Sequence, residues 1–108
     1  MKNSRLNQIL NLQKEDPNNS FLSFAIALEY QACKELTLAI QYFEVLRQKD
    51  PAYLGLYYPL GKIYFELEKS DQAVLIVKEG LEWAKNQNQQ KAQTELQELL
   101  NSYTDLED

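Results

Sequence analysis

Carboxylates and a single thiol are the side chains of this sequence that could perform acid–base or nucleophilic chemistry. The chain has 16 Asp and Glu residues, one cysteine and no histidine. Carboxylate pairs such as Glu66 with Glu68 or Glu79 with Glu82 are interpreted as solvated residues on the surface of helices. Cys33 has no histidine to act as its base, and no metal-ligand spacing or glycine-rich phosphate loop is present. We therefore predict no catalytic residue, no metal and no cofactor, and a protein that is not an enzyme.

Charge and hydropathy exclude two further classes of function. Residues 51–108 hold five Lys and ten Asp or Glu, which accounts for the whole net charge of −5. An acidic protein repels the phosphate backbone, so we expect no nucleic acid partner. No run of about 18 apolar residues indicates a membrane span. The N-terminus lacks the apolar stretch of a signal peptide and Cys33 is the only cysteine, so we predict a cytoplasmic protein.

The elements that must position any functional side chains are helices. Only three Gly and three Pro interrupt the chain, and apolar residues recur at helical spacing. Pro59 falls inside the fourth predicted helix, so we expect a slight bend or a late start there. The predicted helices cover residues 4–14, 20–32, 36–48, 53–67, 70–85 and 89–103.

A repeat of 34 residues relates the second and third helices to the fourth and fifth. Asp16-Pro17 maps on Asp50-Pro51. Small residues recur where the two helices of a hairpin would come closest, and larger apolar residues recur around them. The matched pairs are Phe24/Tyr58, Ile26/Leu60, Ala27/Gly61, Tyr30/Tyr64, Ala39/Ala73, Phe43/Val77 and Leu46/Gly80.

This helix–turn–helix period resembles the tetratricopeptide repeat. The resemblance implies an all-α, right-handed α-α superhelix (a solenoid) of about six antiparallel helices in a single domain, 1–108. Its parts would be an N-terminal half-repeat helix (4–15), two repeats (20–51 and 53–85) and a C-terminal capping helix (89–103). The sequence departs from the family pattern at the turn between the two helices of each hairpin, where Lys34 and Glu68 replace the usual glycine.

Gly80 lies inside a predicted helix, where glycine costs about 1 kcal/mol relative to alanine. Close approach of another helix would offset this cost. We predict that Leu96, Leu99 and Leu100 of the last helix pack near Gly80 and Ala84.

The family resemblance implies that the first helix of each hairpin lines a concave groove for a peptide or partner segment. The protein would then be a small adaptor, scaffold or assembly subunit. A chaperone-tail clamp for a C-terminal carboxylate is not expected, because the matching positions hold Phe24, Leu28 and Pro59, with only Lys62 basic. The groove residues implied are Phe21, Phe24 and Leu28 in the first repeat and Tyr58, Lys62, Phe65 and Glu66 in the second.

The apolar stripe formed by these residues has two alternative roles that the sequence leaves open. The stripe could be buried in a homodimer that has no separate ligand. It could also be partly covered by the chain's own termini and have no ligand, because short solenoids often have such an open face.

Overall fold

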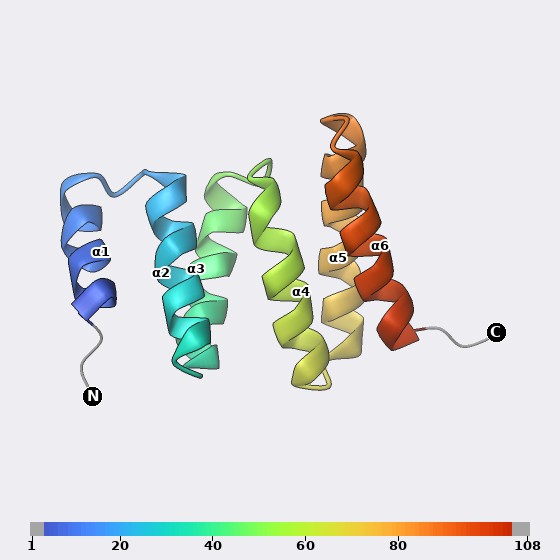
Figure 1. Ribbon diagram of the computed structural model, residues 1–108, viewed down its shortest axis with the longest axis horizontal. Helices are drawn as coiled ribbons and strands as arrows, with labels where there is room; N and C mark the ends of the chain where they lie inside the picture. Colours follow the sequence, from blue (N-terminus) through green and yellow to red (C-terminus); the bar gives the residue numbers. More distant parts are fainter. Residues whose placement is uncertain (1–3, 105–108) are drawn as a thin grey trace. The chain divides into compact units, whose positions relative to one another are not determined.

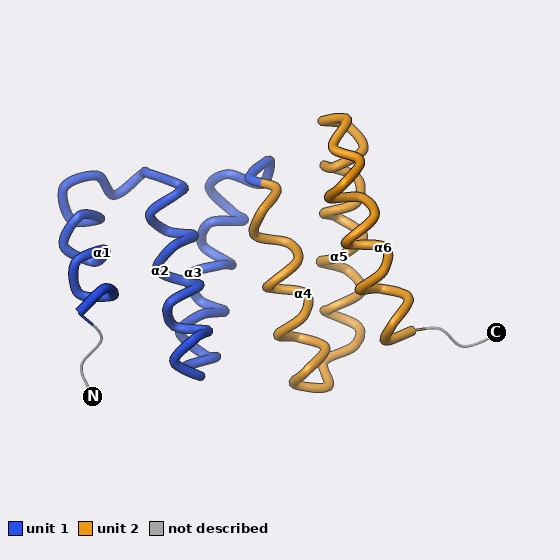
Figure 2. The backbone as a smooth tube through the Cα atoms, in the orientation of Figure 1, with its two compact units in different colours: residues 1–53 blue, residues 54–108 orange. Residues whose placement is uncertain are grey.

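The computed structural model describes residues 4–104, which form six α-helices and one short 3₁₀ helix and contain no strand. The all-α prediction is therefore confirmed for the described residues. The chain packs as two compact units, 1–53 and 54–108, coloured separately in Figure 2. Their boundary lies between Tyr53 and Leu54, one residue after the predicted start of the second repeat.

The first unit contains α1 (Ser4–Glu15), α2 (Ser20–Ala32) and α3 (Leu36–Lys49). Helices α2 and α3 lie side by side and antiparallel, with α1 against α2 (Figure 1). The Asn19 side chain caps α2 by accepting a hydrogen bond of 3.1 Å from the backbone N–H of Leu22. Ser20 Oγ donates a 2.7 Å hydrogen bond to Asp50 Oδ2, which ties the start of α2 to the end of α3. The buried core consists of Ile26, Ala27, Ala39, Phe43 and Leu46.

The second unit contains the 3₁₀ helix η1 (Leu54–Leu56), α4 (Tyr57–Glu66), α5 (Ser70–Asn86) and α6 (Gln90–Thr104). The late start predicted from Pro59 is confirmed, because this proline is the third residue of α4. Its missing N–H would have had no intrahelical partner at that position. Both α4 and α6 pack on α5 (Figure 1). Leu56, Tyr57, Leu60, Ile63, Tyr64, Phe65, Ala73, Ile76, Val77, Ala84, Leu96 and Leu99 form the core.

The small residues of the repeat occupy the same role in both hairpins. Ala27, Ala39 and Ala73 are completely buried, and Gly61 is buried too. A Cβ atom on Gly61 would lie 2.6 Å from Cγ2 of Val77, across the contact between α4 and α5. The hairpins therefore close through these small residues, as the 34-residue repeat predicts.

Three helices end in the same hydrogen-bonded turn without using glycine. Lys34, Glu68 and Asn88 have φ of 64°, 61° and 57°, the left-handed conformation that a glycine usually adopts there. After each of them, the backbone N–H of the following residue donates a hydrogen bond to the carbonyl five residues before it. The bond from the N–H of Glu35 to the carbonyl of Tyr30 is 2.9 Å long. The absence of glycine at Lys34 and Glu68 therefore leaves the geometry of the hairpin turn intact.

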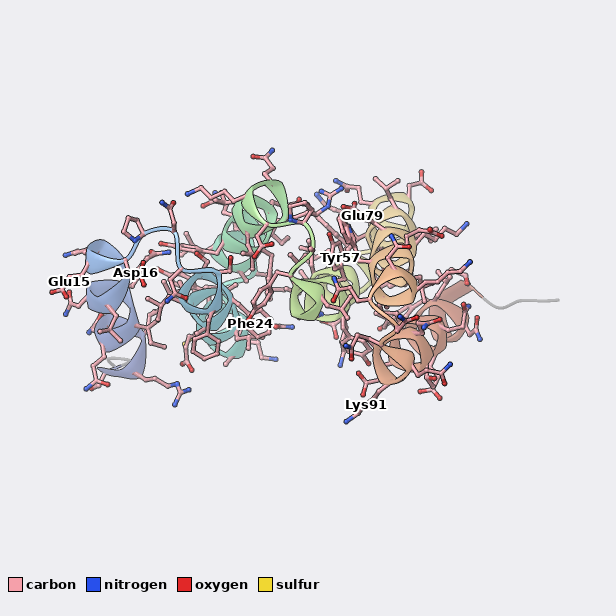
Figure 3. The ribbon with its side chains drawn as sticks, turned by 90° about the horizontal axis from the view of Figure 1, so that it is seen from above. Glu15, Asp16, Phe24, Tyr57, Glu79 and Lys91 are labelled. Atoms are coloured by element: carbon pink, nitrogen blue, oxygen red, sulfur yellow. The ribbon has the colours of Figure 1, made fainter. Side chains whose placement is uncertain are left out.

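Gly80 is buried at a helix contact, but its nearest neighbour differs from the prediction. A Cβ there would lie 2.6 Å from Cβ and 2.8 Å from Cγ of Tyr57, and 3.1 Å from Cδ1 of Leu96. The contact with Leu96 of α6 was expected. The first turn of α4 comes closer still, because Tyr57 enters the core there and its hydroxyl donates a 3.1 Å hydrogen bond to Glu79 Oε2 (Figure 3).

Candidate interaction surfaces

The first unit exposes two large apolar side chains from α2. Phe21 is 63% exposed and Leu28 is 37% exposed. Phe24 lies between them in sequence but packs inward: its ring centroid is 5.3 Å from that of Tyr53 and 6.2 Å from that of Phe43. Of the three groove residues expected in this unit, Phe21 and Leu28 are therefore exposed, whereas Phe24 is half-buried against Phe43 and Tyr53.

The second unit exposes a mixed face on α4. Tyr58 is 39% exposed, and Lys62 and Glu66 are also exposed, each one turn further along the helix. Phe65 behaves differently, since it is only 4% exposed and its ring stacks on that of Tyr103. The sequence placed Phe65 among groove residues free to meet a partner, but the last turn of α6 covers it in this structure.

Tyr58 lies beside two hollows that α4 and η1 form with α6. The first, of about 230 Å³, is lined by Leu54, Gly55, Tyr58, Ala92, Glu95 and Leu96. The second, of about 320 Å³, is lined by Tyr58, Glu95 and Glu98. The shared aromatic ring and the shared carboxylate make these hollows one continuous surface, apolar at one end and acidic at the other.

Glu95, Glu98 and Tyr103 were not among the functional residues predicted from the sequence. One signal was present: Glu95 and Glu98 each immediately precede a leucine of the buried stripe, Leu96 and Leu99, so they flank the face of α6 that packs inward. Which helix would lie opposite them could not be read from the spacing. Only the packing of α6 on α4 and α5 brings these carboxylates next to Tyr58.

The first unit has a hollow of about 200 Å³ that is separate from its predicted groove residues. It is lined by Gln13, Pro17, Ser23, Gln41, Tyr42, Val45 and Lys49. None of Phe21, Phe24 and Leu28 contributes to it. The predicted binding residues of this unit therefore form an exposed apolar face, not the wall of this hollow.

Two tyrosines of the first unit have perturbed acidity. Burial raises the pKa of Tyr53 above its ordinary value, and the neighbouring Asp50 carboxylate adds to the effect. Burial likewise raises the pKa of Tyr42, with a smaller contribution from Tyr30. Both shifts favour the neutral phenol, so neither side chain is prepared to act as a base at neutral pH.

The structure offers no metal-binding cluster among residues 4–104, where no three His, Cys, Asp or Glu side chains come together. Within the same described range, no helix is long and apolar enough to cross a membrane. Cys33, which follows the last residue of α2, is exposed.

Comparison with known proteins gives a consistent result for family and fold. Residues 34–96 match the family model described as tetratricopeptide repeat. The crystal structure of a tetratricopeptide repeat domain protein from Salinibacter ruber is 35% identical, with a TM-score of 0.78 over 82% of this chain and 99% of that one. A solution NMR structure of a tetratricopeptide repeat domain protein from the same organism is also 35% identical, with a TM-score of 0.78 over 84% of this chain and 92% of that one. A search of curated proteins finds no significant match.

Proposed function

Because this chain belongs to the tetratricopeptide repeat family, we propose that it is a non-catalytic protein-interaction module, a small adaptor or assembly subunit. Its partner would be a protein or peptide segment bound through the first helices of the two hairpins, α2 and α4. One observation carries the proposal: these helices keep large apolar side chains in solvent, with Phe21 at 63%, Tyr58 at 39% and Leu28 at 37% exposure.

The roles of the seven groove residues divide between contact and support. Phe21 and Leu28 on α2, and Tyr58 on α4, are the apolar contacts. Lys62 and Glu66 supply charge beside Tyr58. Phe24, which is half-buried, and Phe65, which is buried, would support these contacts, since the rings of Tyr53 and Tyr103 pack against them.

The size of the exposed apolar surface favours a weak, reversible interaction. Each large aromatic side chain offers roughly 150–250 Å² when it is fully buried. Two partly exposed rings and one leucine therefore provide far less than the ~1,000 Å² of a stable interface. An extended peptide segment is a better match to such a surface than a large folded partner.

The test compares partners captured from a cell lysate by wild type and by a Phe21→Ser, Tyr58→Ser variant. Phe24 is unsuitable for this purpose, because its substitution would disturb the packing with Phe43 and Tyr53. Leu75→Ser is the matched control, since Leu75 is 62% exposed but lies on the second helix of its hairpin, α5. The proposal expects partners to be lost from the double variant and kept by the control. Equal recovery by all three proteins would contradict it.

Self-association is the alternative use of the same residues, and the exposure of Phe21 favours it as much as it favours a ligand. In that case the apolar residues of α2 and α4 would be covered by a second copy of the chain. Light scattering at several concentrations separates the two functions. A dimer that the Phe21→Ser, Tyr58→Ser variant abolishes supports the alternative, and a monomer at high concentration excludes it.

We also propose that the protein works in the cytoplasm and does not bind nucleic acid. The lone cysteine is consistent with a reducing compartment. The acidic balance of residues 51–108 opposes association with a phosphate backbone. Fractionation of cells that produce the tagged chain would test the compartment.

A further inference from the structure

We infer that the surface around Tyr58 binds a basic side chain of the partner segment, with arginine preferred to lysine. This inference deepens the proposed function and rests on it. Three features of the second unit point to such a ligand: an exposed aromatic ring, an apolar floor, and two carboxylates on the facing helix.

The apolar part of the surface suits the stem of a long basic side chain. Leu54 and Ala92 flank the hollow beside Tyr58, and the side chain of Leu96, which is 2% exposed, closes its floor. Arginine and lysine bury their methylene groups along such surfaces while keeping the charge at the edge. The hollow therefore offers the stem a contact that an acidic or short polar residue could not use.

The acidic part of the surface suits the charged head group. Glu95 and Glu98 line the hollow beside Tyr58, and within residues 4–104 neither forms an ion pair. The exposed ring of Tyr58 adds a face for a cation–π contact. A guanidinium group can stack on the ring and donate to a carboxylate in its own plane, which an ammonium group cannot do.

Two cations of the chain lie one turn from these groups along their own helices and form no ion pair with the two carboxylates. Lys62 follows Tyr58 by one turn on α4, and Lys91 precedes Glu95 by one turn on α6. Lys91 extends away from the ribbon of α6 (Figure 3). Neither lysine forms an ion pair with Glu95 or Glu98 in this structure.

The negative charge of Glu95 and Glu98 also decides whether the chain's own C-terminal segment or another protein occupies the surface around Tyr58. The last four residues of the sequence, 105–108, carry three carboxylates, so this segment has the same sign as Glu95 and Glu98. The acidic balance of residues 51–108 works in the same direction. A basic residue of another protein is therefore the occupant that the charges favour.

The experiment begins with selection of peptides from a random library on the full chain. Winning peptides are expected to share an arginine next to apolar residues. One winner is then synthesised twice, with arginine and with its uncharged analogue citrulline, and both are titrated into wild type and into a Glu95→Gln, Glu98→Gln variant. Wild type should bind the arginine peptide roughly 3–10-fold more tightly at low salt, and the variant should lose most of this difference, keeping only the part that the Tyr58 ring contributes.

A matched control removes two other carboxylates of the same unit. Glu68 and Glu82 are exposed and line neither hollow at Tyr58, so the Glu68→Gln, Glu82→Gln variant should keep the full difference between the peptides. Tyr58→Leu should reduce the difference without removing it, because the cation–π contact is lost while the carboxylates remain.

Each other result contradicts the inference in a recognisable way. Winning peptides without a basic residue, or an arginine preference that the Glu95→Gln, Glu98→Gln variant keeps in full, would overturn it and leave the proposed function standing. If wild type selects no peptide, both this inference and the proposed function are wrong. If wild type dimerises and the same variant is monomeric, the occupant is a second copy of the chain.

Discussion

The rings of Phe65 and Tyr103 stack face to face, with 4.4 Å between their centroids and 6° between their planes. Phe65 comes from the last turn of α4 and is almost completely buried, whereas Tyr103, from the last turn of α6, remains 48% exposed. The end of α6 thus covers an aromatic residue that the family resemblance assigns to the binding face. In this part of the second unit, the chain's own C-terminal helix therefore covers part of the apolar stripe.

Replacing Tyr103 should destabilise the second unit by removing this cover. We expect Tyr103→Ser to lower the free energy of unfolding by roughly 1–2 kcal/mol, because the stack is lost and Phe65 is exposed to water. Tyr103→Phe keeps both the ring and the stack and should behave like wild type. Urea unfolding followed by Trp83 fluorescence measures the difference. A serine variant as stable as the phenylalanine variant would show that the stack contributes nothing.

Gly80→Ala should destabilise the protein even though alanine is the better helix former. Alanine gains about 1 kcal/mol in helix propensity. The new Cβ would lie 2.6 Å from Cβ of Tyr57, an atom attached directly to the backbone of α4, and overpacking of this kind costs about 1–3 kcal/mol. Gly61→Ala should cost less, because its one close neighbour is a methyl group of Val77. Thermal unfolding of both variants tests the order, and a Gly80→Ala variant more stable than wild type would contradict this packing.

Glycine at the left-handed turn positions should stabilise the protein. Lys34 and Glu68 adopt a positive φ that costs a residue with a Cβ roughly 1 kcal/mol. Lys34→Gly and Glu68→Gly should therefore each raise the melting temperature by a few degrees. Asn88→Gly should have a smaller effect, because asparagine tolerates this conformation better than lysine or glutamate. Lys34→Val is the control and should lower the melting temperature, since a β-branched residue is more strained there.

Stability should fall at alkaline pH because of two tyrosines. The folded state raises the pKa of Tyr42 and Tyr53 above the ordinary value of 10.0. As the pH rises through about 10, the unfolded chain therefore loses these protons before the folded chain does, and the free energy of unfolding decreases. Below that pH the contribution is fully present.

Unfolding of wild type and of a Tyr42→Phe, Tyr53→Phe variant at about pH 8 and pH 11 measures this effect. The variant has no phenol at either position, so its loss of stability between the two pH values should be smaller than that of wild type. The comparison at pH 8 corrects for any change that the missing hydroxyl groups cause by themselves. Equal losses in the two proteins would mean that these tyrosines do not carry the alkaline sensitivity.

The helices and the family could be predicted from local pattern. Asp16-Pro17 and Asp50-Pro51 lie in the turns after α1 and α3, and the small residues at Ala27 and Gly61 lie where the hairpins close. Pro59 indicated the late start of α4 because its missing N–H is tolerated only near a helix N-terminus. These features depend on residues close in sequence or on the 34-residue repeat, so they can be read without the fold.

The outcome for the candidate site was mixed, for a physical reason. The family resemblance assigned all five apolar residues to the groove; Phe21, Leu28 and Tyr58 are exposed, whereas Phe24 is half-buried and Phe65 is buried. The difference comes from rings that are distant in sequence: Phe43 and Tyr53 pack against Phe24, and Tyr103 stacks on Phe65. A helical repeat indicates on which face of its helix a side chain lies, but it does not indicate which other side chains pack against that face.

The sequence by itself determined the helices, the turns, the repeat and the acidic, histidine-free composition. It did so because helix propensity, proline, charge and small-residue spacing act locally. Only the tertiary structure decided that Tyr57 is the closest neighbour of Gly80, that Tyr103 covers Phe65, and that Glu95 and Glu98 lie beside Tyr58. These relationships depend on how α6 packs on α4 and α5, and that packing is set by the shapes of side chains that are far apart in the chain.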